Sequence, residues 1–494
     1  MLWLKHDETG CEVANAGRYV ATEREQAFLD TIENPKYDRE ITNGLKPFFQ
    51  DKAPEDVKNF YSPDEISVLL KLSGTERDVE ARMPVKMTRH FFELAKTSKP
   101  LQRIIKANPN ETLNLAGSED PGHQMDFAPV EGMLHKYEMG LLYAVSTCSA
   151  HCRFCHREEL ISQKDIERQD GTVAKKGLAK INEVTGYVRA HNEIVAANGG
   201  RHPDTGREKL REVLLSGGDP MVLPNRKIGA WMAALAESGV ESIRLGTKEM
   251  SFHPKRFDEA FLAMVDNFHE TYPEVGFRLM IHFNHPDEFL QKAADGTYLQ
   301  NANGSLKWHD ETRRAMEGVI SRGWINVENQ APIIKGINDD SDALRVMQRA
   351  LYRVGVGNHY FFCGRDIVAY QAFNVPIETV WNILNTSQKG LSGVETHARL
   401  SITHYKGKTE VAAVTSEPIP GVPGTENGVL IFKILRNALD APDRGKVCIV
   451  GRNPDAIWFD DYEDRVIFDE AGLYDYARVD KKTVEIDEAM EAVV

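Results

Sequence analysis

The sequence predicts an α/β fold in which parallel strands form a whole or partial barrel. Between about residues 126 and 400, short apolar runs alternate with amphipathic stretches, and this alternation favours strand–helix units joined by right-handed crossovers. An open doubly wound sheet is the alternative that the same alternation leaves open. The runs expected as strands are GLLYAVST, REVLLSGG, SIRLGT, GFRLMIHF, WINVENQ and NHYFFC.

Helical stretches lie between these runs, with apolar residues at three- and four-residue spacing. They read KIGAWMAALAES, PKRFDEAFLAMVDNF, DETRRAMEGVISR and DSDALRVMQRALYRV. A long polar stretch at 163–211 interrupts the pattern. Its middle, LAKINEVTGYVRAHNEIVAA, predicts one crossover helix that carries surface insertions.

Two flanking regions complete the expected organisation. Residues 1–125 contain helix-like segments, so we expect a helical N-terminal region; the segments are TEREQAFLDTI, PEDVKNFYS, PDEISVLLKLSG and TRHFFELAKTS. Residues 401–494 contain the strand-like segments SITHY, EVAAVT, VCIVG and DRVIFD, with a helix expected over VLIFKILRNAL. We therefore expect a barrel over 126–400 followed by an α+β C-terminal extension.

Composition excludes several classes of protein. With 41% hydrophobic and 27% charged residues, the chain is typical of a globular protein. It has no run of about 18 apolar residues and no pattern of a cleaved leader, so a cytoplasmic location without membrane insertion is expected. The net charge of −14 disfavours nucleic acids and anionic membranes as partners. Six cysteines in 494 residues are too few for a dense disulfide framework.

Half of these cysteines lie in the stretch TCSAHCRFCHREE, directly after the first apolar run. Cys148, Cys152 and Cys155 have the spacing C-x3-C-x2-C. Soft thiolates suit an iron–sulfur cluster, and three of them leave one iron of a [4Fe–4S] cluster open to another ligand. Two alternatives are an apolar stripe on a helix, and zinc bound with His151 and His156.

This arrangement resembles the radical SAM superfamily, in which S-adenosylmethionine chelates the open iron and is cleaved to an adenosyl radical. LLSGGDP, at 214–220, is similar to the glycine-rich element of that superfamily at its second strand. The resemblance implies that Gly217, Gly218 and Asp219 bind the cofactor. Physically, the glycines permit a close backbone approach, and the aspartate offers acceptors or a helix cap.

Further segments resemble the lysine 2,3-aminomutase family in the family's own order. These are PVEGMLHKY, CSAHCRFCHRE, LLSGGD, IRLGTKEMSFHPKRF, HFNHPDE, NQAPIIKGIND and YFFCGRD, within roughly 129–410. The resemblance implies a 1,2-shift of an amino group on lysine or a similar small amino acid, through an imine with pyridoxal phosphate (PLP). It also implies an electron donor such as flavodoxin or ferredoxin, and a homo-oligomer.

The family holds PLP on a lysine after a glycine-rich stretch, and the matching segment here is ARLSITHYKGKTEVAAV. Lys408 fits this register best, and Lys406 is the second candidate. Gly140 or Met139 stands where the family has an arginine for the cofactor phosphate. Lys136 or His135 is the expected substitute.

Substrate contacts follow from the same resemblance. Arg157 matches the arginine that pairs with the substrate carboxylate. Asp339 and Asp366 match the two aspartates that receive the ammonium of lysine. Asp339 also suits a structural role beside the helix DALRVMQRAL. If the match to the family is shifted by one residue, Arg365 instead of Asp366 would face the side chain of the substrate, and an acidic substrate would be favoured.

Polar residues that follow other strands complete the expected cofactor site. They are His282, Asn284 and Gln330, with Asn329, Arg244 and Thr247 in similar positions. Two other functions stay open at this point. One is a radical SAM enzyme without PLP that abstracts hydrogen and then epimerises, oxidises or eliminates. The other is a zinc-stabilised binding protein without catalytic activity.

Overall fold

The strands of the computed structural model form one large sheet. The structure describes residues 83, 85–107, 111, 116–118, 120–162, 166–167, 173–174, 177–368, 370–437 and 444–474. Within these ranges a 12-stranded sheet has the order β1-β2-β5-β6-β7-β8-β9-β10-β11-β12-β13-β14, beside a small sheet of β3 (Ile166–Glu167) and β4 (Val173–Ala174). The α/β class is confirmed. The helices expected over TEREQAFLDTI, PEDVKNFYS and PDEISVLLKLSG lie outside the described residues.

The apolar runs expected as strands are all strands, and each pairs with the next in parallel. They are β2 (Met139–Val145), β5 (Glu212–Gly217), β6 (Ser242–Thr247), β7 (Gly276–Ile281), β8 (Asn326–Pro332) and β9 (Gly357–Phe362). Their order in the sheet follows the chain without the reversal that marks a doubly wound sheet. Their carboxyl ends therefore meet along one edge.

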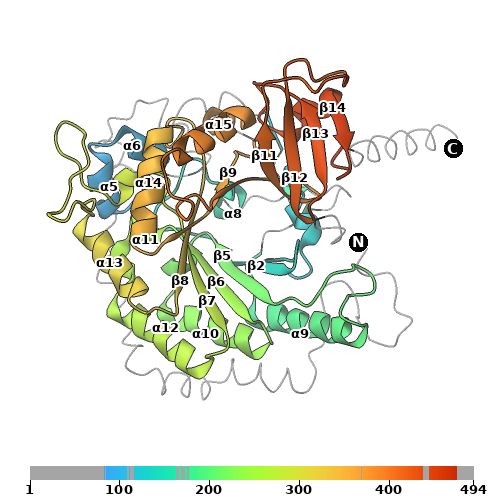
Figure 1. The fold of residues 1–494 in the computed structure, drawn as a ribbon. Coiled ribbons are helices and arrows are strands. Elements are labelled where there is room, and N and C mark those ends of the chain that lie inside the picture. Colours follow the sequence, from blue (N-terminus) through green and yellow to red (C-terminus); the bar gives the residue numbers. More distant parts are fainter. Residues whose placement is uncertain are drawn as a thin grey trace.

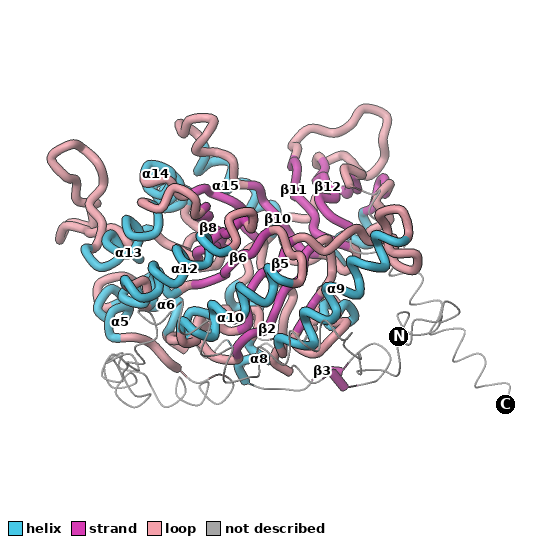
Figure 2. Tube along the Cα trace, turned by 90° about the horizontal axis from the view of Figure 1, so that it is seen from below, coloured by secondary structure: helices cyan, strands magenta, loops and turns pink. Residues whose placement is uncertain are grey.

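Amphipathic helices connect the parallel strands and lie along their outer side (Figure 1). They are α9 (Ile181–Ala197), α10 (Asn225–Glu237), α12 (Glu259–Thr271), α13 (Asp310–Ile320) and α14 (Ser341–Arg353). Asp258 caps α12 and Asp340 caps α14, each through its side-chain oxygen. Figure 2 shows the same layer of helices around the strands from below.

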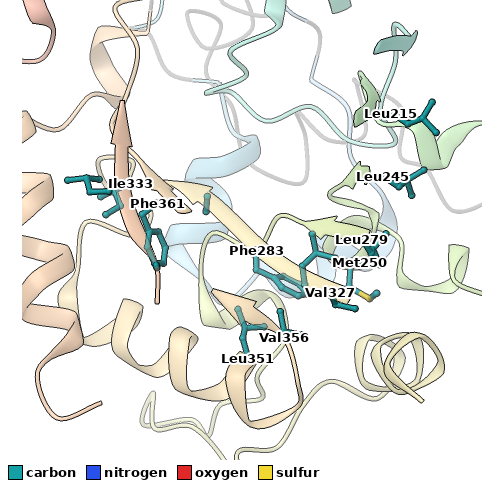
Figure 3. Close-up of a cluster of buried hydrophobic side chains, with 14 of the residues drawn as sticks. Leu215, Leu245, Met250, Leu279, Phe283, Val327, Ile333, Leu351, Val356 and Phe361 are labelled. Carbon is teal, nitrogen blue, oxygen red and sulfur yellow. The ribbon is translucent and has the colours of Figure 1, made fainter. Parts of the chain in front are cut away.

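The core lies between the strands and these helices. Leu215, Leu245, Leu279, Val327 and Phe361 come from β5 to β9 in turn, and each is buried (Figure 3). Burying a side chain of this size contributes about 1.5–3 kcal/mol. One apolar residue from each strand therefore ties the parallel strands to their helices.

Short elements and loops complete this region. They are β1 (Met133–Leu134), the helices α8 (Glu158–Ser162), α11 (Glu249–Phe252) and α15 (Ile377–Gln388), and the 3-10 helices η3 (Gln124–Phe127), η4 (Pro220–Val222), η5 (Pro254–Arg256), η6 (Pro286–Glu288) and η7 (Gln371–Phe373). Among the described residues, no helix is long and apolar enough to cross a lipid bilayer.

Two N-terminal helices form a second core against the cysteine loop. In α5 (Arg89–Ala95) and α6 (Lys99–Ile105), Phe91 and Ile104 are fully buried. They belong to one cluster with Phe154, which lies between the second and third cysteines, and with Phe373. The described part of the N-terminal region is thus packed onto the loop that follows β2.

The C-terminal strands continue the sheet, and one expected element is wrong. Strand β10 (Arg399–Thr403) pairs in parallel with β9, and antiparallel strands follow it. They are β11 (Gly407–Val414), β12 (Val429–Asn437), β13 (Val447–Gly451) and β14 (Val466–Asp469). The segment VLIFKILRNAL, expected as a helix, contains β12. Its backbone pairs with β11 on one edge and β13 on the other, and most of its apolar side chains are buried, which together override their helix propensity.

The expected α+β extension is accordingly corrected for its described residues. Residues 401–437 and 444–474 hold strands and the 3-10 helix η9 (Phe459–Arg465), with no α-helix in those ranges. The expected domain boundary at 400/401 falls inside β10. The division into regions 1–125, 126–400 and 401–494 stays a prediction.

Candidate active site

The three clustered cysteines lie on the loop between β2 and α8. Cys148, Cys152 and Cys155 form no disulfide within the described residues, and each is partly exposed. The loop turns tightly, because the Cys155 amide donates to the carbonyl of Cys152 at 3.1 Å and the Glu158 amide donates to the carbonyl of Cys155 at 3.2 Å. One loop at the carboxyl edge of the parallel strands thus carries all three thiols.

Residues of the N-terminal region contact this loop, an arrangement that no local pattern in the sequence predicts. The Lys86 ammonium donates to the carbonyl of Cys148 at 2.6 Å, and the Arg153 amide donates to the carbonyl of Ile104 at 2.8 Å. Arg153 also forms an ion pair with Glu111 at 2.8 Å, with both side chains buried. A buried pair of this kind makes the shape of the loop depend on residues far away in the chain.

The surroundings of these thiols disfavour the thiolate form that binds a metal. Burial raises the pKa of Cys148 and of Cys152 well above the ordinary thiol value, and the carboxylate of Asp219 adds to the effect on Cys148. Iron would replace these protons, since only thiolates bind it. Within the described ranges, no three His, Cys, Asp or Glu side chains gather as ligands of one metal ion. A cubic cluster instead takes one thiolate on each of three irons.

The two glycines after β5 let this strand end against the cysteine loop. Gly217 has φ +118°, and a Cβ there would lie 2.3 Å from the carbonyl oxygen of Val145. A Cβ on Gly218 would lie 2.2 Å from the carbonyl oxygen of Thr147. The Gly218 amide donates to Val145 at 2.6 Å and the Asp219 amide to Thr147 at 2.9 Å. The motif thus joins the two loops directly.

Asp219, expected to bind a cofactor, has its carboxylate turned into the protein. It accepts hydrogen bonds from the Thr247 hydroxyl at 2.8 Å, from the Lys248 amide at 2.6 Å and from the Met221 amide at 3.0 Å. These contacts join the loops after β5 and β6. Asp219 therefore positions the glycine loop, and its oxygens already have protein donors.

Arg157 reaches from the cysteine loop to the end of β5. Its Nη1 donates to the Ser216 hydroxyl at 2.6 Å and to the Gly217 carbonyl at 2.8 Å. Its guanidinium also lies 5.6 Å from the centre of the Tyr143 ring. No ion pair of Arg157 occurs among the described residues, so its positive charge is available to an anion at this edge.

The loop after β7 brings two more of the expected residues to the same place. The Nε2 atom of His282 and the Nδ2 atom of Asn284 are buried without a hydrogen-bond partner in the described structure. The Lys248 ammonium donates to Asn284 Oδ1 at 2.9 Å and to Glu288 Oε2 at 2.6 Å. Burial lowers the pKa of His282, and the charges of Lys248 and Arg157 lower it further. Both unpartnered nitrogens are suited to contacting a ligand.

Gln330 lies on β8 and is partly buried. Its backbone is in register with Tyr360 of β9. No hydrogen bond of its side chain occurs among the described residues. The neighbouring Asn329 instead has a structural role, since its Oδ1 accepts from the Phe283 amide at 2.8 Å.

Lys408 lies near the start of β11, beside aromatic rings of β9. Its ammonium nitrogen is 4.0 Å from the centre of the Tyr360 ring and 5.3 Å from that of Phe362. Gly407 allows this placement, because a Cβ there would lie 2.0 Å from the carbonyl oxygen of Arg436. No carboxylate forms an ion pair with Lys408 within the described part of the chain.

The surroundings of Lys408 favour a neutral amine. Burial lowers its pKa to about 7, and the positive charges of Arg436, Arg244 and Arg365 contribute. An amine of this kind is a nucleophile near neutral pH, which is what bonding to an aldehyde requires.

The two expected substitutes for the phosphate-binding arginine have protein partners. The Lys136 ammonium donates to the carbonyls of Gly122 at 2.7 Å and His404 at 3.0 Å. Burial lowers the pKa of Lys136 to about 7. His135 Nδ1 lies 2.6 Å from the Tyr187 hydroxyl. Lys136 is near the charge of Arg365, whereas His135 belongs to a different cluster.

The two aspartates expected to hold an ammonium group lie apart from these residues. Asp339 is exposed, and its Oδ1 accepts from the Gly336 amide at 2.9 Å. Asp366 accepts a hydrogen bond from Gln371. No hydrogen bond or ion pair among the described residues joins either carboxylate to Lys408 or to Arg157.

A surface hollow of about 520 Å³ lies elsewhere, between loops of the C-terminal strands. Its arginines have protein partners: Arg452 pairs with Glu378 at 2.8 Å, and Arg465 donates to the carbonyl of Arg452 at 2.8 Å. It contains none of the residues singled out in the sequence. The carboxyl edge of the parallel strands is therefore the candidate active site.

Several known proteins are similar to this chain over much of its length. No family model matches the chain. A provisionally named L-lysine 2,3-aminomutase of Aquifex aeolicus (strain VF5) is 30% identical over 370 residues, which are 74% of this chain and 83% of that protein. The L-lysine 2,3-aminomutase of Acetoanaerobium sticklandii is 25% identical over 297 residues, 59% of this chain and 60% of that protein.

A glutamate 2,3-aminomutase is also similar. The enzyme of Clostridioides difficile is 25% identical over 277 residues, which are 56% of this chain and 54% of that protein. The long match to the Aquifex protein covers most of both chains and includes the cysteine loop's region of the fold. The chain therefore belongs to the lysine 2,3-aminomutase family of radical SAM enzymes and is an isomerase of that family.

Proposed function

We propose that this enzyme is a PLP-dependent 2,3-aminomutase acting on a free α-amino acid, with Lys408 as the lysine that bonds PLP. The observation that carries the proposal is the Lys408 amine: the residue is half-buried, its pKa is lowered to about 7, and its ammonium nitrogen lies against the Tyr360 ring without an acidic partner in the described residues. An ordinary surface lysine has none of these properties.

The residues present fit the three groups that the family uses. Cys148, Cys152 and Cys155 would hold a [4Fe–4S] cluster, and Gly217 and Gly218, which bring the end of β5 against the cysteine loop, would place backbone beside S-adenosylmethionine. Lys408 would hold PLP. We also propose that β2 and β5 to β9 curve into a partial (β/α)6 barrel, because their order follows the chain and helices cover one side.

The side chains have separate tasks in this proposal. When bound, these groups supply hydrogen abstraction by an adenosyl radical and a conjugated π system for the shifting nitrogen. Arg157 orients the substrate carboxylate from the end of β5. Lys408 offers a neutral amine at the opposite side. Phe154 and Tyr370 are buried in the cluster that packs on the cysteine loop, where they exclude water and so protect a reactive radical.

Reductive trapping tests the PLP lysine. The protein is incubated with PLP, reduced with borohydride, digested and examined by mass spectrometry. We expect the phosphopyridoxyl group on the peptide that contains Lys408, and its loss in Lys408→Ala but not in Lys406→Ala. A protein with a full iron–sulfur cluster that binds no PLP would contradict the proposal. It would favour the radical SAM enzyme without PLP, whose mark is 5′-deoxyadenosine formed without an amino shift.

Some partners remain predictions. Cleavage of S-adenosylmethionine needs one electron, so a donor such as flavodoxin or ferredoxin is proposed. A homo-oligomer is proposed from the family alone. The names of the relatives cover a basic and an acidic amino acid, so the choice of substrate side chain rests on the charges around the site.

A further inference from the structure

Arg365 is an arginine inside the site that the proposed mechanism does not yet use. It follows β9 on the segment Cys363–Gly364–Arg365. Its Nη1 is buried and has no hydrogen-bond partner among the described residues. Burial lowers the pKa of this guanidinium, and no ion pair of Arg365 occurs in the described structure. The Arg365 side chain is half-buried, and a buried guanidinium nitrogen without a partner costs free energy, which points to an anion that binds there.

Its charge interactions place Arg365 near both Lys408 and the cysteine loop. Its positive charge contributes to the lowered pKa of Lys408. The same charge lowers the pKa of Tyr370, which Cys152 and Cys155 raise. The positive charge of Arg157 in turn lowers the pKa of Arg365. The space between the PLP lysine and the cluster is where a substrate must lie if a radical made at one is to reach an atom held at the other.

This space has an excess of positive charge. Arg157, Arg365 and Lys408 have no ion-pair partner in the described part of the chain. Cations around them do: Arg244 pairs with Glu212 at 2.7 Å, and Arg436 with Glu138 at 3.7 Å. Asp120 is the carboxylate whose charge raises the pKa of Arg365 most. It accepts a hydrogen bond from the Met125 amide, however, and forms no ion pair with the arginine.

The aspartate next to Arg365 does not offset this charge. Asp366 accepts a hydrogen bond from Gln371, and its pKa is raised by burial and by the charge of Asp461 rather than lowered by the site's cations. Adjacent residues of one segment therefore point to different surroundings. The arginine lies with Arg157 and Lys408, and the aspartate lies with the loop of η7.

Given the proposed function, on which this inference rests, we infer that Arg365 binds a carboxylate on the substrate side chain, so that the substrate is a dicarboxylic α-amino acid. Arg157 takes the α-carboxylate and Arg365 the second one. A guanidinium suits this role because it donates two parallel hydrogen bonds to a carboxylate. An ammonium side chain at the same place would meet Arg365 and Lys408 without a counter-charge.

Binding of matched amino acids tests the inference. Protein reconstituted anaerobically with iron, sulfide, S-adenosylmethionine and PLP is titrated by calorimetry with L-glutamate, L-glutamine and L-lysine. Glutamine has nearly the shape of glutamate without its charge. We expect L-glutamate to bind roughly a hundredfold more tightly than L-glutamine, and L-lysine to bind more weakly than both. Tighter binding of L-lysine would overturn the inference, and this comparison needs no variant.

Variants then assign the preference to one residue. Arg365→Gln should remove the preference for L-glutamate and leave L-glutamine binding unchanged, which also shows that the variant folds. Arg365→Lys should restore part of it. Asp366→Asn should leave the glutamate-to-glutamine ratio as in the wild type. Loss of PLP content in Arg365→Gln would assign Arg365 to the cofactor phosphate and overturn the inference.

The two proposals fail in different ways. A protein that keeps the glutamate preference but leaves Lys408 untrapped by borohydride, or forms no β-amino product, would refute the aminomutase proposal and support the role of Arg365. A protein that traps PLP on Lys408 yet binds L-glutamate and L-glutamine equally would do the reverse.

Discussion

The ammonium nitrogen of Lys408 lies 4.0 Å from the centre of the Tyr360 ring, so a strand added after the parallel strands places its lysine on an aromatic side chain of β9. The face of an aromatic ring attracts a cation, but the burial and the nearby arginines outweigh this and lower the pKa to about 7. The protein thus holds an amine in an environment that costs stability.

Replacing Lys408 with Met should therefore stabilise the protein without cofactors. The ordinary pKa of lysine is 10.5 and the folded value is about 7, so between these pH values the unfolded chain binds a proton that the folded chain does not. Wild-type stability should rise with pH across this window, and Lys408→Met should lack the slope and gain on the order of 2 kcal/mol at pH 7.5.

Urea unfolding at pH 7.5 and 9.5 measures both effects. Exposed Lys389, replaced with Met, is the matched control and should leave the free energy of unfolding nearly unchanged. An unchanged pH slope in Lys408→Met would mean that the lysine is hydrated and charged.

Cys152→Ser should lose most of its iron and sulfide after anaerobic reconstitution, because a hydroxyl is a poor ligand for iron in a cluster. Chemical analysis of iron and sulfide, with the visible absorbance of the cluster, provides the measurement. Cys448→Ala is the control, since Cys448 is buried on β13 away from the loop, and it should retain both. Equal retention in the two variants would remove Cys152 from the ligand set.

Gly218→Ala should separate the glycine loop from the cysteine loop. The new Cβ would lie 2.2 Å from the carbonyl oxygen of Thr147, so backbone has to move. We expect a loss of about 1–3 kcal/mol in the free energy of unfolding and less cluster per protein. Gly393→Ala meets no atom within 4 Å and should change neither quantity. Wild-type cluster content in Gly218→Ala would show that the contact is dispensable.

The histidines around His191 should make stability fall in acid. His135 and His202 lie with ring centres 4.8 Å and 5.3 Å from that of His191. Burial lowers the pKa of His191 from 6.5 to about 4. The unfolded chain therefore binds more protons between these values, and stability falls as pH drops from 6.5 towards 4, by on the order of 2 kcal/mol for this residue.

His191→Phe should flatten that part of the stability profile, measured by urea unfolding at pH 7.5, 6.5, 5.5 and 4.5. The exposed His397, changed to Gln, should leave the profile unaltered. A profile in His191→Phe as steep as in the wild type would place the acid sensitivity elsewhere.

The sequence predicted the parallel strands well, because each is a short apolar run followed by an amphipathic helix. The segment VLIFKILRNAL was predicted as a helix but contains strand β12, and the reason is physical. Nine consecutive residues with mixed Leu, Ile and Val fit a buried strand as well as a helix, and only pairing with β11 and β13 decides between them.

Site residues followed the same rule. Cys148, Cys152, Cys155, Arg157 and Lys408 follow or begin strands, so position in the chain predicted their common edge. Directions of side chains could not be predicted: Arg365 and Asp366 are adjacent, yet they lie in different surroundings. Lys86 and Glu111 come from a region whose packing onto the cysteine loop leaves no local pattern.

The ties between that region and the cysteine loop bear on how the enzyme matures. The His151 amide donates to the carbonyl of Lys86, and Arg153 to that of Ile104, both at 2.8 Å. These segments are synthesised before the loop that they hold. The N-terminal segments can thus order the cysteine loop before any metal binds. A chain shortened to begin at β1 would keep the three thiols but would lose the contacts that hold their loop.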